Sequence, residues 1–137
     1  MFEFRYNSNG DSIVGIPDFT INATYAVAAK PGDVVKLNTS GEVVAAVTGD
    51  TEVLGVFIGP EIKVEADTTY RGKVRVHHGD VFEADVTGGD PIVGTSYGIN
   101  DDSVVDIADT TTTVVTAVAI SPRAGKGYFK ITGRQLG

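Results

Sequence analysis

Residues 33–47 read DVVKLNTSGEVVAAV and contain the clearest folding signal of the chain. Two runs rich in β-branched residues, Asp33–Leu37 and Glu42–Val47, flank the short link Asn38–Gly41. Valine fits the pleated surface of a strand, and glycine supplies the positive φ angle that a tight turn requires. The stretch therefore predicts a β-hairpin.

Similar runs recur along the chain, separated by turn residues that include many of the 17 glycines. The predicted strands are Asp33–Leu37, Glu42–Val47, Val53–Ile58, Tyr70–His78, Val81–Val86, Ser103–Ile107, Val114–Ile120 and Gly127–Thr132. Short strands at this spacing are typical of a barrel or sandwich. The one helical candidate, Thr24–Ala29, is followed at once by Pro31 and Gly32, so we expect strand or loop there. The predicted fold is all-β, with a small barrel over residues 23–137.

Residues 1–22 differ from the rest and are predicted to form an extended N-terminal arm. Aromatic residues alternate with charged ones at the start of the chain, and residues 7–12 then favour irregular structure. Two interpretations remain open: the segment pairs within its own sheet, or it reaches a partner. On the second interpretation the partner contacts are Phe2, Phe4, Arg5 and Tyr6.

Two predicted strands lack the alternation of a half-buried strand. Residues 43–47 and 114–120 are apolar or small on both faces. Both faces of such strands must be covered. The second face of these strands is covered either by other structure packed on the outside of a closed barrel or by a second subunit. We therefore expect the chain to self-associate.

The overall charge limits the partners of this chain of 137 residues. It is −7 at pH 7, with a pI near 4.6, so most of the surface repels phosphate and no nucleic-acid partner is expected. Alternating basic residues of one strand predict a solvated outer face or a contact with an acidic partner. They are Arg71, Lys73, Arg75 and His77. A second basic set is expected to face an acidic protein surface and comprises Arg123, Lys126, Lys130 and Arg134.

No motif for catalysis, cofactor binding or a metal is found, and no enzyme is expected. The chain has no cysteine, and the neighbours His77 and His78 would point to opposite faces of a strand. The segment Arg123–Gly127 only superficially resembles a phosphate loop. Residues Asn100–Asp106 lack the spacing of an EF-hand, so a solvated turn is expected there, with a loose cation site as the alternative.

Two further expectations concern organisation. Gly32-Asp33-Val34 is echoed by Gly79-Asp80-Val81, but such triplets arise easily in a β protein, so no internal repeat is predicted. The first six residues lack the pattern of a secretion signal, and no apolar run is long enough to span a bilayer. We therefore expect neither a secretion signal nor a membrane partner.

The order of the motifs resembles that of tailed-phage head decoration, or capsid cement, proteins. The segments that carry the resemblance are Ala28–Leu37, Gly41–Ala46 and Val53–Val56, followed more loosely by Gly79–Phe82 and Ala124–Ile131. Together they cover residues 23–132. Residues 1–22 have no counterpart in this pattern, so the mode of docking is not given by it.

The resemblance implies a compact barrel of SH3-like or β-tulip type without catalytic activity. It also implies binding to the major capsid protein on the exterior of the virion, as a homotrimer at threefold or quasi-threefold sites, after synthesis in the host cytoplasm. The alternative is a phage tail, fibre or carbohydrate-binding β module, which predicts aromatic residues grouped in a cleft. An enzyme or small-ligand barrel would instead require a deep pocket with convergent polar groups.

Overall fold

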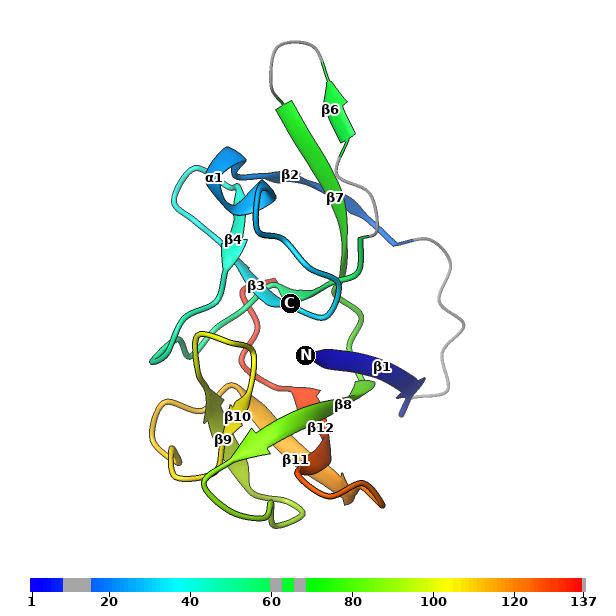
Figure 1. Ribbon diagram of the computed structural model, residues 1–137, viewed down its shortest axis with the longest axis vertical. Coiled ribbons are helices and arrows are strands. Elements are labelled where there is room, and N and C mark those ends of the chain that lie inside the picture. The colour runs from blue at the N-terminus through cyan, green and yellow to red at the C-terminus, as the bar shows by residue number, and fades with distance from the viewer. Residues whose placement is uncertain (9–15, 60–62, 66–68, 137) are drawn as a thin grey trace.

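The computed structural model describes residues 1–8, 16–59, 63–65 and 69–136 (Figure 1). These residues form strands and one short helix, and 45% of the chain is strand. The elements are β1 (Phe2–Asn7), β2 (Asp18–Ile21), α1 (Ala23–Ala26), β3 (Val34–Leu37), β4 (Val43–Ala45), β5 (Gly55–Phe57), β6 (Lys63–Glu65), β7 (Thr69–Arg75), β8 (Asp80–Thr87), β9 (Ser96–Ile99), β10 (Val105–Asp106), β11 (Val115–Ile120) and β12 (Lys126–Ile131). The all-β class and the predicted barrel are confirmed.

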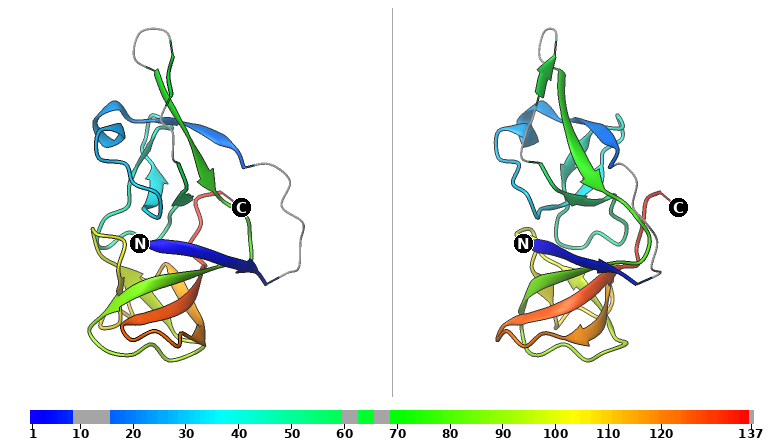
Figure 2. Two further views of the ribbon diagram at one scale, coloured as in Figure 1. Left: turned by 45° about the vertical axis from the view of Figure 1, so that its right-hand side comes forward. Right: turned by 90° about the vertical axis from the view of Figure 1, so that its right-hand side faces the viewer.

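The strands divide into two sheets rather than one. In the C-terminal half, the pairings run β8–β10–β9–β11–β12 and return to β8, which closes a five-stranded barrel. In the N-terminal half, the pairings run β2–β4–β3–β5–β7 and likewise return to β2, with β6 added at the side of β7. We call these the second and the first barrel. Figures 1 and 2 show them stacked along the long axis, with the β6–β7 hairpin at one end.

The two barrels share one topology. In each, the first strand pairs in parallel with the third and antiparallel with the last, while the second pairs antiparallel with the third and fourth. The fourth strand pairs antiparallel with the last. The register agrees as well: Leu37 lies opposite Val43 as Ile99 lies opposite Val105. The chain is therefore a structural tandem.

The hairpin turns of the two barrels match in detail. The side chain of Asn38 accepts hydrogen bonds from the N–H groups two and four residues later, both at 2.9 Å. Asn100 does the same at 3.1 and 3.2 Å. The residue three positions on has a positive φ in both turns, 75° at Gly41 and 57° at Ser103. The hairpin predicted over residues 33–47 is confirmed.

The two Gly-Asp-Val triplets are not a repeat, as expected, because they are not equivalent in the structure; the tandem itself was not predicted. Gly32 corresponds to Gly94, because both donate their N–H to the equivalent carbonyl of the fourth strand and both have φ near +90°, 96° and 89°. Gly79 instead precedes the first strand of the second barrel. Register and hydrogen bonds define the repeat, since few of the equivalent residues are identical.

The barrels bury apolar surface against each other. Val34 and Val56 of the first barrel belong to the same core cluster as Phe2 and Phe82, and all four are nearly inaccessible. The Ser103 hydroxyl accepts a hydrogen bond from the Val34 N–H at 2.9 Å. Of residues 43–47, for which cover on both faces was expected, Ala46 joins this cluster whereas Val47 is 44% exposed, so the other half of the chain covers only part of this strand.

Each predicted strand overlaps an observed one, but the N-terminal region requires corrections. Residues 23–26 form the helix α1, because the Asn22 side chain accepts hydrogen bonds from two N–H groups of its first turn and Tyr25 anchors it in the core. Strand β1 pairs antiparallel with β8, and β2 belongs to the first barrel. The predicted boundary between residues 22 and 23 therefore separates no structural unit, and the barrels instead meet between β7 and β8.

Candidate protein-binding surface

The four predicted partner contacts lie on β1, which crosses the junction of the barrels (Figure 2). Phe2 is only 2% exposed and packs in the core with its ring centroid 6.0 Å from that of Phe82, so its prediction as a partner contact was wrong. Phe4 is half-buried, and its ring lies 3.5 Å from the Arg75 guanidinium carbon. Only Tyr6, 48% exposed, presents much of its side chain to solvent.

Arg5 is bound to a buried carboxylate of the second barrel. Its guanidinium lies 2.6 Å from Glu83, which also accepts a hydrogen bond from the Ser121 hydroxyl at 2.7 Å. Arg123 approaches the same carboxylate at 3.3 Å. The bond from Arg5, followed by that from Ser121, lowers the pKa of Glu83. This group ties β1 to β8 and to the turn after β11.

The Glu83 cluster predicts acid sensitivity. A carboxylate whose pKa is lower in the folded than in the unfolded chain stabilises the fold above its unfolded pKa, 4.5 for glutamate, and this stability is lost as the pH falls through the folded value. We expect the melting temperature of Glu83→Gln to fall less steeply than that of the parent chain below pH 4.5. Thermal melts across this range test it, and parallel curves for the two chains would contradict it.

The first basic set does not form a free row of charges. Strand β7 ends at Arg75, so His77 lies beyond it, and Arg75 is bound to the buried Asp80 at 2.7 Å. Lys73 forms an exposed pair with Asp18 at 3.1 Å. Of the four residues, only Arg71 and Lys73 are exposed charges that fit the predicted solvated outer face.

The second basic set is also divided among partners within the chain. Lys126 is bound to Asp85 at 2.7 Å, and Arg123 joins the Glu83 cluster. Arg134 donates to the backbone carbonyls of Val76 and His77, both at 2.8 Å, and burial lowers its pKa. Lys126 and Lys130 nevertheless lie on the same outward face of β12, with Arg123 in the turn before it, whereas Arg134 lies beyond the strand. Contact of this set with an acidic protein surface stays a prediction.

No metal-binding group of three or more His, Cys, Asp or Glu side chains occurs among the residues that the structure describes. In the acidic segment, Asn100 caps its own turn and Asp101 accepts a hydrogen bond from the Thr48 N–H at 2.7 Å, which lowers the pKa of Asp101. The segment thus serves as a turn that contacts the first barrel.

Several exposed apolar side chains lie on the second barrel, at the end away from β6 and β7. We call this surface the apolar end; it comprises the exposed Ile92, Val93, Ile120 and Pro122 and the half-buried Pro91. Ile92, Val93 and Ile120 are 67%, 52% and 75% exposed. They belong to the connection after β8 and to the turn after β11, both at the bottom of Figure 1. Apolar groups that gather on a surface mark interaction sites more often than scattered ones do.

The apolar end is held on a firm frame. The Ile92 N–H donates to the Tyr97 hydroxyl at 2.9 Å, and the Gly94 N–H donates to the Ala117 carbonyl at 2.8 Å. Pro91 and Ile120 line one surface cavity. Sequence reasoning missed this surface because it placed no element at residues 91–94, although an apolar run after two glycines was a visible signal.

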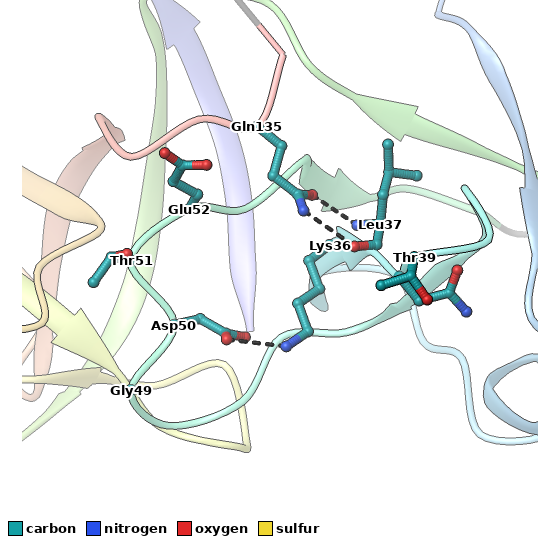
Figure 3. Close-up of a pocket in the computed structure, with 9 residues that line it drawn as sticks. Lys36, Leu37, Thr39, Gly49, Asp50, Thr51, Glu52 and Gln135 are labelled. Carbon is teal, nitrogen blue, oxygen red and sulfur yellow. Dashed lines mark hydrogen bonds and ion pairs between the residues drawn. The ribbon is translucent and has the colours of Figure 1, made fainter.

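A polar hollow of about 540 Å³ lies on the first barrel (Figure 3). Lys36 and Asp50 form an ion pair across it at 2.9 Å. The Gln135 side chain bonds both the N–H and the carbonyl of Leu37, at 2.7 and 3.1 Å, and so attaches the C-terminal segment to β3. The hollow offers charged and amide groups to a small polar ligand.

Comparison with known proteins adds no relative. The chain matches no protein-family model, no curated protein and no solved structure. Among the described residues, no helix is long and apolar enough to cross a membrane. Inferences on function therefore rest on the surfaces described above and on the resemblance in the sequence.

Proposed function

We propose that the chain is a structural protein that binds the outer surface of an assembled tailed-phage head and stabilises it. The observation that carries the proposal is the apolar end, where three large aliphatic side chains are more than half exposed on a hydrogen-bonded frame. Such a surface suits contact with another protein. The resemblance to decoration proteins selects the major capsid protein as that partner and the exterior of the virion as the location.

The proposal includes a homotrimer at threefold or quasi-threefold positions of the head. A shell repeats each contact many times, and if subunits of a trimer bind together, modest contacts suffice because avidity multiplies them. A shallow apolar surface is consistent with this mode of binding.

Co-sedimentation with expanded and unexpanded heads of candidate tailed phages tests the proposal. We expect saturable binding to expanded heads, with a copy number that follows the threefold sites. Ile120→Lys should weaken binding at least about tenfold, because the substitution places a charge on a side chain that the bound head would bury. Val27→Lys changes an 89% exposed residue outside the apolar end and should bind as the parent does. A chain that binds neither form of the head would contradict the proposal.

The second candidate is the carbohydrate-binding module, for which the polar hollow offers the groups that bond sugars, although its described lining contains none of the aromatic residues that such a module predicts. Its lining of lysine, carboxylate and amide groups could bond sugar hydroxyls. Saturable binding of a glycan, lost in Glu52→Ala and retained in Ile120→Lys, would support this function over capsid binding.

A further inference from the structure

The apolar end has a counterpart in the first barrel, which the shared topology identifies. Gly32 and Gly94 occupy equivalent positions before the second strand of each barrel. The Gly32 N–H donates to the Phe57 carbonyl at 2.7 Å, and the Gly94 N–H donates to the Ala117 carbonyl at 2.8 Å. The two backbones thus present the same surface, formed by a glycine bonded to the third residue of the fourth strand.

In the first barrel this surface is covered by the start of the chain. The Phe2 N–H donates to the Gly32 carbonyl at 2.8 Å, and a Cβ atom built on Gly32 would collide with the Met1 side chain. The residues that meet there also include Pro31 and Ile58. An extended apolar segment therefore lies directly on this glycine.

In the second barrel the equivalent surface is open. A Cβ atom built on Gly94 would meet nothing within 4 Å in the described part of the chain. Val93, which corresponds to Pro31, is 52% exposed. Strand β11 has a bulge between Ala117 and Ala119 and continues to Ile120, which is 75% exposed.

We infer that Val93, Gly94 and the adjoining part of β11, which continues to the exposed Ile120, form a docking site for an extended apolar segment of a partner polypeptide. The occupant shares the chemistry of Met1–Phe4, in which apolar residues enclose an acidic one. Its backbone N–H bonds the Gly94 carbonyl, as Phe2 bonds Gly32.

The occupant comes from another molecule, because the N-terminal segment of the chain is already used. Phe2 is 2% exposed, and β1 pairs with β8 over most of its length. The identification of the partner as the capsid protein rests on the proposed function, whereas the site itself rests on the comparison of the two barrels. The two can therefore fail separately.

The test uses a synthetic peptide of residues 1–7, MFEFRYN, added to the isotope-labelled full chain and followed by NMR. We expect saturable shifts at Val93, Gly94 and Ile120. Ile120→Lys should weaken peptide binding at least about tenfold, and Val27→Lys should leave it unchanged. A scrambled peptide of the same composition should bind at least about tenfold more weakly. Thermal melts of both variants establish that they are folded.

Three outcomes would overturn the inference: no saturable binding, equal binding by Ile120→Lys, or shifts confined to β8 and Gly32, which would mean exchange with the chain's own β1. If heads bind the chain but the peptide does not, the proposed function stands and the docking site at Gly94 is contradicted. If the peptide binds at Gly94 but no head binds the chain, the docking site stands and the proposed function is contradicted.

Discussion

Phe2→Ala is expected to lower the free energy of unfolding by about 3–5 kcal/mol, the usual range for removing a buried phenylalanine. The side chain is 2% exposed and shares a cluster with residues of both barrels. The backbone of Phe2 also bonds Gly32, while its strand pairs with β8. The substitution therefore removes packing at the point where the two barrels meet.

Chemical denaturation followed by circular dichroism measures this effect, with Tyr6→Ala as the matched control. Tyr6 lies on the same strand but is 48% exposed, so its loss should change the free energy of unfolding by only about 0.5 kcal/mol. If residues 1–7 were a free N-terminal arm, Phe2→Ala and Tyr6→Ala would change the free energy of unfolding by similar, small amounts. Equal, small effects would therefore show that β1 does not belong to the core.

The sequence predicted local structure well where a single strand or turn carries its own signal. The link Asn38–Gly41 has both a capping asparagine and a glycine for the positive φ angle, and the turn forms as expected. The missed strands β2, β6 and β9 are only three or four residues long. Alternation over so few residues is weak, so pairing with neighbours decides their structure.

The tandem and the apolar end could not be predicted in this way. Equivalent positions carry unlike residues: Val34 is buried against the other barrel, whereas its counterpart Ser96 is half-exposed. Because equivalent positions have different surroundings, different residues fit there although the register is the same. Exposure of Ile92 and Ile120 likewise depends on which turns gather at one end of the barrel, and this follows only from the closed topology.

The second large effect is expected at Asp80, which is 1% exposed at the start of β8. Its carboxylate accepts hydrogen bonds from Arg75 at 2.7 Å and from Asn7 at 2.9 Å. It thus joins the end of the first barrel, β1 and the second barrel. Asp80→Ala would leave the guanidinium of Arg75 buried without its counter-charge, at a cost of about 3–5 kcal/mol.

The exposed pair of Asp18 and Lys73 is the matched control, with the two charges 3.1 Å apart and more than half exposed. Asp18→Ala should cost at most about 1 kcal/mol, because water screens such a pair. The stability of Asp80→Ala should also recover in part when Arg75 is replaced by methionine, since the cost arises from the unpaired charge and not from the lost attraction. If the double variant were no more stable than Asp80→Ala, the loss would instead lie in the bond to Asn7 and the packing around it.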